Sequence, residues 1–243
     1  MNRSLKIFPT PEELVHSFAD DLVNFIKEAI ENQHIVTIAL SGGSTPKLLY
    51  TLLADKYSCS VDWQKVHFFW GDERCVPPDD IESNYGTAYR LFLSKINIPA
   101  ANIHRIRGED DPEMEAARYS TELIINVSLR DGLPAFNLII LGVGDDGHTA
   151  SIFPGNLRLM DSEKVCEAAI HPVSGQKRVT ITGRVINNAD WITFLVTGLN
   201  KSNIVEDILG QHEIAVNYPA SHIVPVHGNV SWILDKRAGK YII

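Results

Sequence analysis

Short apolar runs recur along the chain, and each is followed directly by a glycine-containing or polar segment. The runs occupy residues 35–40, 66–70, 136–141 and 191–196. They are apolar at consecutive positions, a pattern typical of parallel strands that are buried on both faces. Stretches with helical spacing of apolar residues separate them. The pattern predicts an α/β fold with a doubly wound, mostly parallel sheet and helices on both faces, a Rossmann-like three-layer sandwich.

Capping residues predict where two of the helices begin. Thr10, Pro11 and Glu13 combine a helix cap, a proline at the first helical position and a capping-box glutamate. Asp111 and Pro112 begin a second helix that is expected to reach about residue 129. Because no repeat, low-complexity tract or long linker interrupts the chain, we expect residues 1–243 to form a single domain.

Composition limits the classes of partner. A formal net charge of −8 argues against nucleic acid, which usually requires a basic face. Three cysteines, none in a Cys-x-x-Cys pair, indicate neither a disulfide framework nor a zinc knuckle. The N-terminal residues lack the apolar core of a signal peptide, and no run is long enough to span a bilayer. We therefore expect a cytoplasmic protein with neither a nucleic-acid nor a membrane partner.

The segment after the first run contains Gly42, Gly43, Ser44 and Thr45. Ligands of open α/β sheets bind beyond the carboxyl ends of the strands, so such segments are where function is expected. Taken alone, this one is more typical of a tight turn with a helix cap. Its functional interpretation is a phosphate cradle, because glycines let backbone N–H groups approach an anion. The spacing of a Walker loop is absent.

Residues 142–147 match the dinucleotide fingerprint Gly-x-Gly-x-x-Gly and follow a predicted strand. The context argues against a dinucleotide, since two adjacent aspartates would face the pyrophosphate. Pro154 and Gly155 would also end any helix within about two turns, where the Rossmann unit needs a longer one. We therefore expect no cofactor at this loop.

The same loop presents His148 directly after two carboxylates and a glycine. The ordinary pKa of histidine lies near neutrality, so a positioned imidazole can take a proton from water. A lone histidine is more often structural or merely exposed, and the chain has nine. A zinc site would need further ligands at a spacing such as His-Glu-x-x-His, which is absent, so no metal is expected.

Arg74 and Lys201 are cations that follow two other apolar runs. Either could simply be solvated at the edge of the protein. Arginine has a fork of donors that suits phosphate, and lysine provides a point charge at a helix start. Their occurrence together with a glycine loop favours an anionic substrate.

These motifs taken together resemble the 6-phosphogluconolactonase family over nearly the whole chain. The matching segments are residues 41–46, 72–74, 76–78, 83–84, 141–155, 178–180, 198–201 and 227–232. That family shares its architecture with glucosamine-6-phosphate deaminases. Deaminases usually have a tyrosine where Arg74 stands and a glutamate where Phe153 stands, so both positions favour the lactonase.

The resemblance implies that the chain hydrolyses 6-phospho-D-glucono-1,5-lactone in the oxidative pentose phosphate pathway, without a cofactor. It implies His148 as the general base and Asp146 as its supporting neighbour, although Asp145 is an alternative partner. It further implies that the 6-phosphate is bound by Arg74, Lys201, residues 42–45 and, more weakly, Arg178, and that Asp72 contacts sugar hydroxyls.

Two alternative functions stay open at this point. One is a glucosamine-6-phosphate deaminase or isomerase. The other is a non-catalytic sugar-phosphate sensor, since related folds serve as effector-binding domains of regulators. No DNA-binding extension is evident in the sequence, and a sensor would have little use for an Asp-Gly-His turn.

Overall fold

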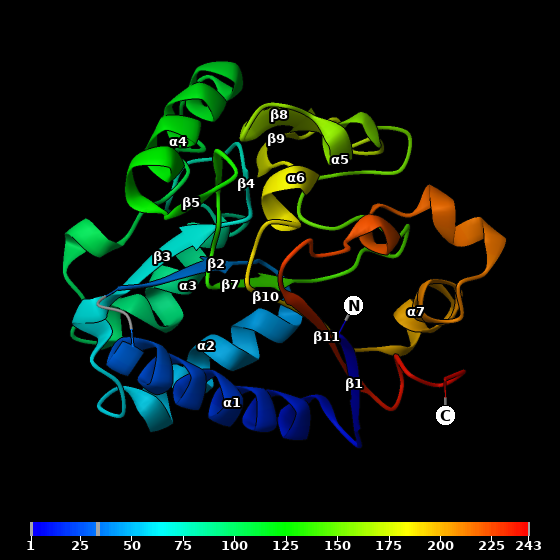
Figure 1. Cartoon of the computed structure of the whole chain (residues 1–243), viewed down its shortest axis with the longest axis horizontal. Coiled ribbons are helices and arrows are strands. Elements are labelled where there is room, and N and C mark those ends of the chain that lie inside the picture. Colours follow the sequence, from blue (N-terminus) through cyan, green and yellow to red (C-terminus); the bar gives the residue numbers. More distant parts are fainter. Residues whose placement is uncertain (1, 33–34, 243) are drawn as a thin grey trace.

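The structure, a computed structural model, describes residues 2–32 and 35–242. Its centre is a parallel sheet of six strands in the order β1-β11-β10-β7-β2-β3 (Figure 1). The predicted apolar runs form β2 (Val36–Leu40), β3 (Val66–Trp70), β7 (Leu138–Leu141) and β10 (Trp191–Val196). The two remaining strands, β1 (Asn2–Phe8) and β11 (Asn229–Asp235), are not predicted from the sequence. The predicted parallel sheet is thus confirmed and is wider than expected.

Helices lie on both sides of this sheet, as predicted (Figure 1). On one side, α1 (Pro11–Asn32) contacts β11 and α2 (Ser44–Tyr57) contacts β10, while α4 (Pro112–Asn126) lies on the other side. Thr10 caps α1 by accepting a hydrogen bond from the N–H of Glu13. Asp111 caps α4 in the same way, through the N–H groups of Glu113 and Met114. The helices are α1 (Pro11–Asn32), α2 (Ser44–Tyr57), α3 (Asn84–Leu91), α4 (Pro112–Asn126), α5 (Arg158–Asp161), α6 (Gly183–Ile186) and α7 (Ser202–Leu209). No helix among the described residues is long and apolar enough to cross a bilayer.

A second, antiparallel sheet stands beside the first and was not predicted. It contains β4 (Asp72–Arg74), β9 (Lys177–Ile181) and β8 (Cys166–Ile170), in that order. The segment 72–74, interpreted from sequence as a loop after a strand, is therefore itself a strand of this small sheet. A short hairpin of β5 (Leu129–Arg130) and β6 (Leu133–Pro134) completes the strands.

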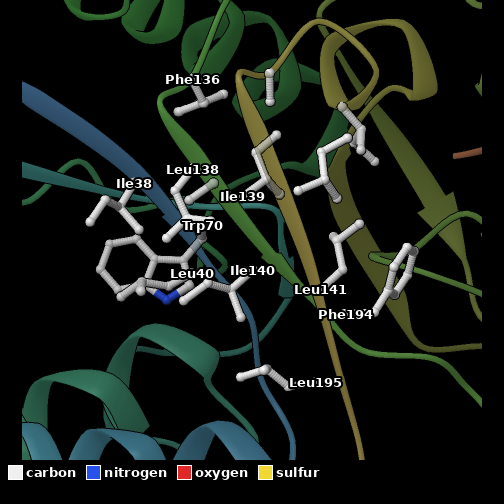
Figure 2. Packing of buried hydrophobic residues seen from close by; sticks show 14 of the residues in the cluster. Ile38, Leu40, Trp70, Phe136, Leu138, Ile139, Ile140, Leu141, Phe194 and Leu195 are labelled. Carbon is white, nitrogen blue, oxygen red and sulfur yellow. The ribbon is translucent and has the colours of Figure 1, made fainter. Parts of the chain in front are cut away.

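The core of the molecule lies on both faces of the parallel sheet. Figure 2 shows the buried side chains there: Ile38 and Leu40 of β2, Trp70 of β3, Leu138, Ile139, Ile140 and Leu141 of β7, and Phe194 and Leu195 of β10. All four residues of β7 are buried, as are all five of β2. Strands that bury both faces are rigid, so the loops at their carboxyl ends start from fixed positions.

Candidate active site

The order of the strands brings two glycine-containing loops to one crevice. β2 and β7 are neighbours, whereas β3 lies beyond β2 and β10 lies beyond β7. The sheet therefore has its topological switch point between β2 and β7, which is where open α/β sheets bind ligands. The loops that follow these two strands, residues 41–43 and 142–148, both begin at this point.

A cavity of about 290 Å³ lies at this edge. The volume is near the lower end of the range for small-molecule sites, roughly 300–1,000 Å³. Seven of the residues singled out from sequence line it: Gly42, Gly43, Asp72, Arg74, His148, Arg178 and Lys201. Ser44, Thr45 and Asp146, which the structure also describes, lie outside its lining. The cavity thus joins residues from five separate segments of the chain.

His148 is held by Asp146. The Nδ1 atom of His148 lies 2.6 Å from Oδ1 of Asp146, and the same oxygen accepts the backbone N–H of His148 at 3.1 Å. Partial burial opposes ionisation of Asp146, but these bonds outweigh it and lower its pKa to about 2. The carboxylate is therefore charged at neutral pH and orients the imidazole through its Nδ1 atom.

The turn that carries this pair is closed by backbone hydrogen bonds. The N–H of Gly144 donates to the carbonyl of His148 at 2.8 Å, and the N–H of Gly147 donates to the carbonyl of Gly144 at 3.1 Å. A Cβ on Gly144 would lie 2.0 Å from His148 Nδ1, so no larger residue fits without moving the pair. Gly147 has φ +82° and packs against the ring of Tyr218. Gly144 and Gly147 of the apparent dinucleotide fingerprint therefore serve the Asp146–His148 turn.

Asp145 is directed to a different partner. Its carboxylate accepts hydrogen bonds from Nζ of Lys201 and from Nδ2 of Asn200, the latter at 2.8 Å. Lys201 is mostly buried and lines the cavity, whereas Asp145 is 67% exposed. Of the two aspartates left open by the sequence, Asp146 is thus the partner of His148, and Asp145 links the same turn to Lys201.

Two arginines form one wall of the cavity. Arg74 of β4 and Arg178 of β9 are directly opposed in the antiparallel register and so project from the same face of the small sheet. Burial, and then the like charge of Arg74, lower the pKa of Arg178. Within the described part of the chain, the buried Nε atoms of both arginines have no hydrogen-bond partner. Two guanidinium groups that line one cavity suit an anionic ligand.

β4 also contributes two acidic residues beside this wall, Asp72 and Glu73. Asp72 is buried, lines the cavity and accepts a hydrogen bond from Ser151 Oγ at 2.6 Å. Glu73 is also buried and accepts the backbone N–H groups of Arg74, Asn84 and Tyr85 at 2.7–2.8 Å. Burial raises the pKa of Glu73, although those backbone hydrogen bonds oppose the rise. Asp72 is thus available to a ligand, whereas Glu73 fixes the loop that follows Arg74.

The loop after β2 leads directly into α2. Gly43 precedes the helix with φ +112°, and among the described residues no side chain caps this N-terminus. Its free N–H groups therefore remain available beside the cavity. Thr45 has a structural contact instead: its Oγ1 lies 2.8 Å from Oγ1 of Thr197 in the loop after β10. Ser44 is exposed at the first position of α2.

Several cavity residues were not singled out as site residues from sequence. Asn84 and Ser151 occur in the motifs quoted above, so the motif context could have identified them. Phe153 lies between two imidazoles, with ring centroids 4.9 Å from His148 and 5.0 Å from His171. No local sequence signal marks His171. Among residues 2–32 and 35–242, no group of three or more histidine, cysteine or acidic side chains could hold a metal ion.

Comparisons with known proteins agree with the resemblance seen in the motifs. Residues 9–232 match the family described as glucosamine-6-phosphate isomerases/6-phosphogluconolactonase. The 6-phosphogluconolactonase of Haemophilus influenzae is 44% identical over 95% of this chain and 96% of its own length, and that of Aggregatibacter actinomycetemcomitans is 43% identical over 97% and 98%. The structure of 6-phosphogluconolactonase from Trypanosoma brucei superimposes with a TM-score of 0.89 at 29% identity, covering 100% of this chain and 99% of that one. The chain therefore belongs to the glucosamine-6-phosphate isomerase/6-phosphogluconolactonase family.

Proposed function

We propose that this protein hydrolyses 6-phospho-D-glucono-1,5-lactone to 6-phosphogluconate, with His148 as the general base. One observation carries the proposal: a single cavity contains a carboxylate-held histidine together with two arginines whose buried Nε donors have no partner among the described residues. The names of the relatives support the same substrate. This reaction supplies 6-phosphogluconate to the oxidative pentose phosphate pathway, and we propose a cytoplasmic location on that ground.

The phosphate end of the substrate is assigned to the cations of the cavity. Arg74 and Arg178 offer fork-shaped donors, and Lys201 adds a point charge. The N-terminus of α2, beside Gly42 and Gly43, contributes free backbone N–H groups. The phosphate is on C6 and the reacting carbon is C1, so binding of the phosphate acts mainly by holding the lactone beside His148.

The chemical step follows from the tautomer of His148. Because Asp146 accepts the Nδ1 hydrogen bond, the neutral ring carries its proton on Nδ1 and leaves Nε2 free as a base. Nε2 takes a proton from water as its oxygen attacks C1, which forms a tetrahedral oxyanion. Collapse of this intermediate breaks the bond between C1 and the ring oxygen, and His148 returns the proton to that oxygen. Backbone N–H groups of the glycine-rich turns are suited to stabilise the oxyanion.

We assign Asp72 to binding the sugar ring of the substrate. Its carboxylate is fixed by Ser151 and lines the cavity, so it can accept hydrogen bonds from substrate hydroxyls. Asn84 Nδ2 donates to the carbonyl of Asp72 at 3.0 Å and holds the residue from the other side. An acceptor fixed in this way favours a polyhydroxylated ring over an apolar lactone.

The competing deaminase function is disfavoured by Phe153. Its buried phenyl ring contacts His148 at the position where deaminases usually have a glutamate for ring-opening proton transfers. A phenyl ring exchanges no proton. We therefore assign ring opening by hydrolysis and not by isomerisation.

The test compares two activities of the purified protein. Acid release from 6-phosphogluconolactone is measured against its spontaneous hydrolysis, and ammonia release from glucosamine 6-phosphate is measured in parallel. Accelerated lactone hydrolysis alone supports the proposal. Ammonia release alone would assign the deaminase function, and binding of 6-phosphogluconate without either activity would assign the sensor.

A further inference from the structure

His171 lies at the end of β8, in the hairpin that leads to β9. Its N–H donates to the carbonyl of Gln176 at 2.9 Å, which extends the antiparallel register of Ala169 with Arg178 and of Ile170 with Lys177. Opposed residues of antiparallel strands share a face, and so do residues two apart on one strand. His171 therefore projects from the same face of the small sheet as Arg178 and Arg74. All three residues line the cavity.

Hydrogen bonds fix the tautomer of His171. Its Nδ1 accepts the backbone N–H of Val173 at 3.2 Å and that of Ser174 at 3.1 Å. An atom that accepts two N–H groups carries no proton, so the neutral ring carries its proton on Nε2. Among the described residues none is hydrogen-bonded to Nε2. Nε2–H, at the edge of the ring away from these two N–H groups, is thus a hydrogen-bond donor with a fixed direction.

The ring itself is held in place. Phe153 contacts His171 edge-on, with centroids 5.0 Å apart and planes at 70°. The same phenyl ring contacts His148 at 4.9 Å. His171 therefore stands on the arginine wall, separated from the Asp146–His148 pair by one aromatic side chain. A donor in this place lies on the same wall of the cavity as the two arginines.

We propose that His171 binds the substrate phosphate through Nε2–H, as a third donor beside Arg74 and Arg178. The proposal rests on the proposed function, because it takes the ligand of that wall to be the 6-phosphate. A neutral donor adds a hydrogen bond to the phosphate without adding a third positive charge to two arginines that already repel each other. The step is binding only, and no proton is transferred.

Two conservative variants separate binding from a merely structural role. In His171→Asn the side-chain oxygen takes the place of Nδ1 and accepts the N–H groups of Val173 and Ser174, but the Nε2 donor is lost. In His171→Gln the amide nitrogen takes the place of Nε2 and keeps the donor, while the acceptor for the hairpin is lost. If Nε2 binds the substrate, His171→Gln should keep more affinity than His171→Asn. If His171 only supports the hairpin, the order of the two affinities should be reversed.

Calorimetric titration with 6-phosphogluconate gives the dissociation constant without any turnover. We expect His171→Asn to weaken binding roughly tenfold or more and His171→Gln to stay within about threefold of the wild type, because a hydrogen bond to a charged group is lost only in the first. Inorganic phosphate, used as a competitor in the same titration, should lose affinity in the same order. The proposal is overturned if His171→Asn binds 6-phosphogluconate as tightly as His171→Gln does. It is also overturned if His171→Asn loses affinity for 6-phosphogluconate but not for inorganic phosphate.

The readout also separates this proposal from the proposed function. If the wild-type protein binds 6-phosphogluconate but does not accelerate lactone hydrolysis, the proposed reaction is wrong. The dissociation constants of the two variants then still decide the role of His171. Wild-type protein that binds neither 6-phosphogluconate nor inorganic phosphate overturns both. Near-ultraviolet circular dichroism of each variant checks that the cavity is folded.

Discussion

Oδ1 of Asp146 lies 2.6 Å from Nδ1 of His148 and at the same time accepts the backbone N–H of that residue. One carboxylate oxygen thus sets the position of the histidine backbone and the orientation of its ring. This double contact fixes the imidazole of His148, as the proposed role of a general base requires. The same contact gives two predictions that use different measurements.

The first prediction concerns turnover. His148→Ala should lower kcat by a factor on the order of 10² or more, since general base catalysis is lost. Asp146→Asn should also lower kcat, because the amide no longer fixes the tautomer that leaves Nε2 free. Initial rates at saturating lactone measure both. His212→Ala serves as the control, because His212 forms a similar pair with Asp207 outside the cavity. Near-normal turnover in folded His148→Ala would remove His148 as the base.

The second prediction concerns stability and pH. The pKa of Asp146 is lowered in the folded protein to about 2, so the charged carboxylate stabilises the fold above its ordinary pKa. That contribution is lost as pH falls through about 4 towards about 2. Asp146 is 42% exposed, so solvent screening reduces the expected effect to about 1 kcal/mol. Urea unfolding of wild type and Asp146→Asn should differ by this amount at neutral pH. A difference that stays undiminished below about pH 2 would contradict the assignment.

The sequence predicts those parts of the fold whose burial is complete. β2 and β7 are buried throughout, and their consecutive apolar residues reveal them. β1 is missed because it is an edge strand with exposed polar residues, and β9 because its first residue is exposed and its second is a half-buried arginine. Periodicity reflects burial, so strands that face a solvent-filled cavity or an edge leave a weak pattern.

The candidate site likewise contains residues that the sequence reveals and residues that it does not. His148, Arg74 and Lys201 were found because they follow buried strands or lie in motifs. The choice of Asp146 over Asp145 depends on the closed turn at residues 144–148, which no local pattern specifies. His171 reaches the cavity only through the pairing of β8 with β9, which is a long-range property. Residues that tertiary pairing alone brings to a site have no signature in a single sequence.

The third prediction concerns Gly144. A Cβ at this position would lie 2.0 Å from His148 Nδ1 and 2.6 Å from Asp146 Oδ1. Gly144→Ala must therefore displace the pair, and kcat should fall on the order of 10²-fold, the usual effect of misplacing a catalytic group by about 1 Å. Gly71→Ala is the control, because its new Cβ would meet only ordinary contacts from 3.7 Å. A Gly144→Ala protein with wild-type kcat would show that the closed turn is not required for catalysis.

The fourth prediction concerns the arginine wall. Arg74→Ala and Arg178→Ala should each raise KM roughly tenfold or more with a smaller change in kcat, because phosphate is bound in both the ground state and the transition state. Arg178→Lys should not restore the wild-type KM, since lysine lacks the fork of donors. Lys177→Ala is the matched control, because this exposed neighbour projects from the opposite face of β9. An unchanged KM in either alanine variant would remove that arginine from the phosphate site.

The fifth prediction concerns Glu73, whose role is structural although it stands between two cavity residues. Its buried carboxylate accepts three backbone N–H groups and the hydroxyl of Ser83. Glu73→Ala would leave these donors buried without a partner and should cost roughly 3 kcal/mol of unfolding free energy. Glu163→Ala, at an exposed position, should change stability by no more than about 0.5 kcal/mol.

The Glu73 variant also tests whether the loop after β4 depends on this residue. The N–H of Arg74 and the start of α3 at Asn84 are both held by the Glu73 carboxylate, so its loss should loosen the backbone that presents Arg74. KM should therefore rise together with the loss of stability, whereas a destabilised core variant such as Leu138→Ala should lower stability with less effect on KM. Chemical denaturation and steady-state kinetics on the two proteins separate these outcomes. Equal stability losses with equal KM values would mean that Arg74 is positioned without the help of Glu73.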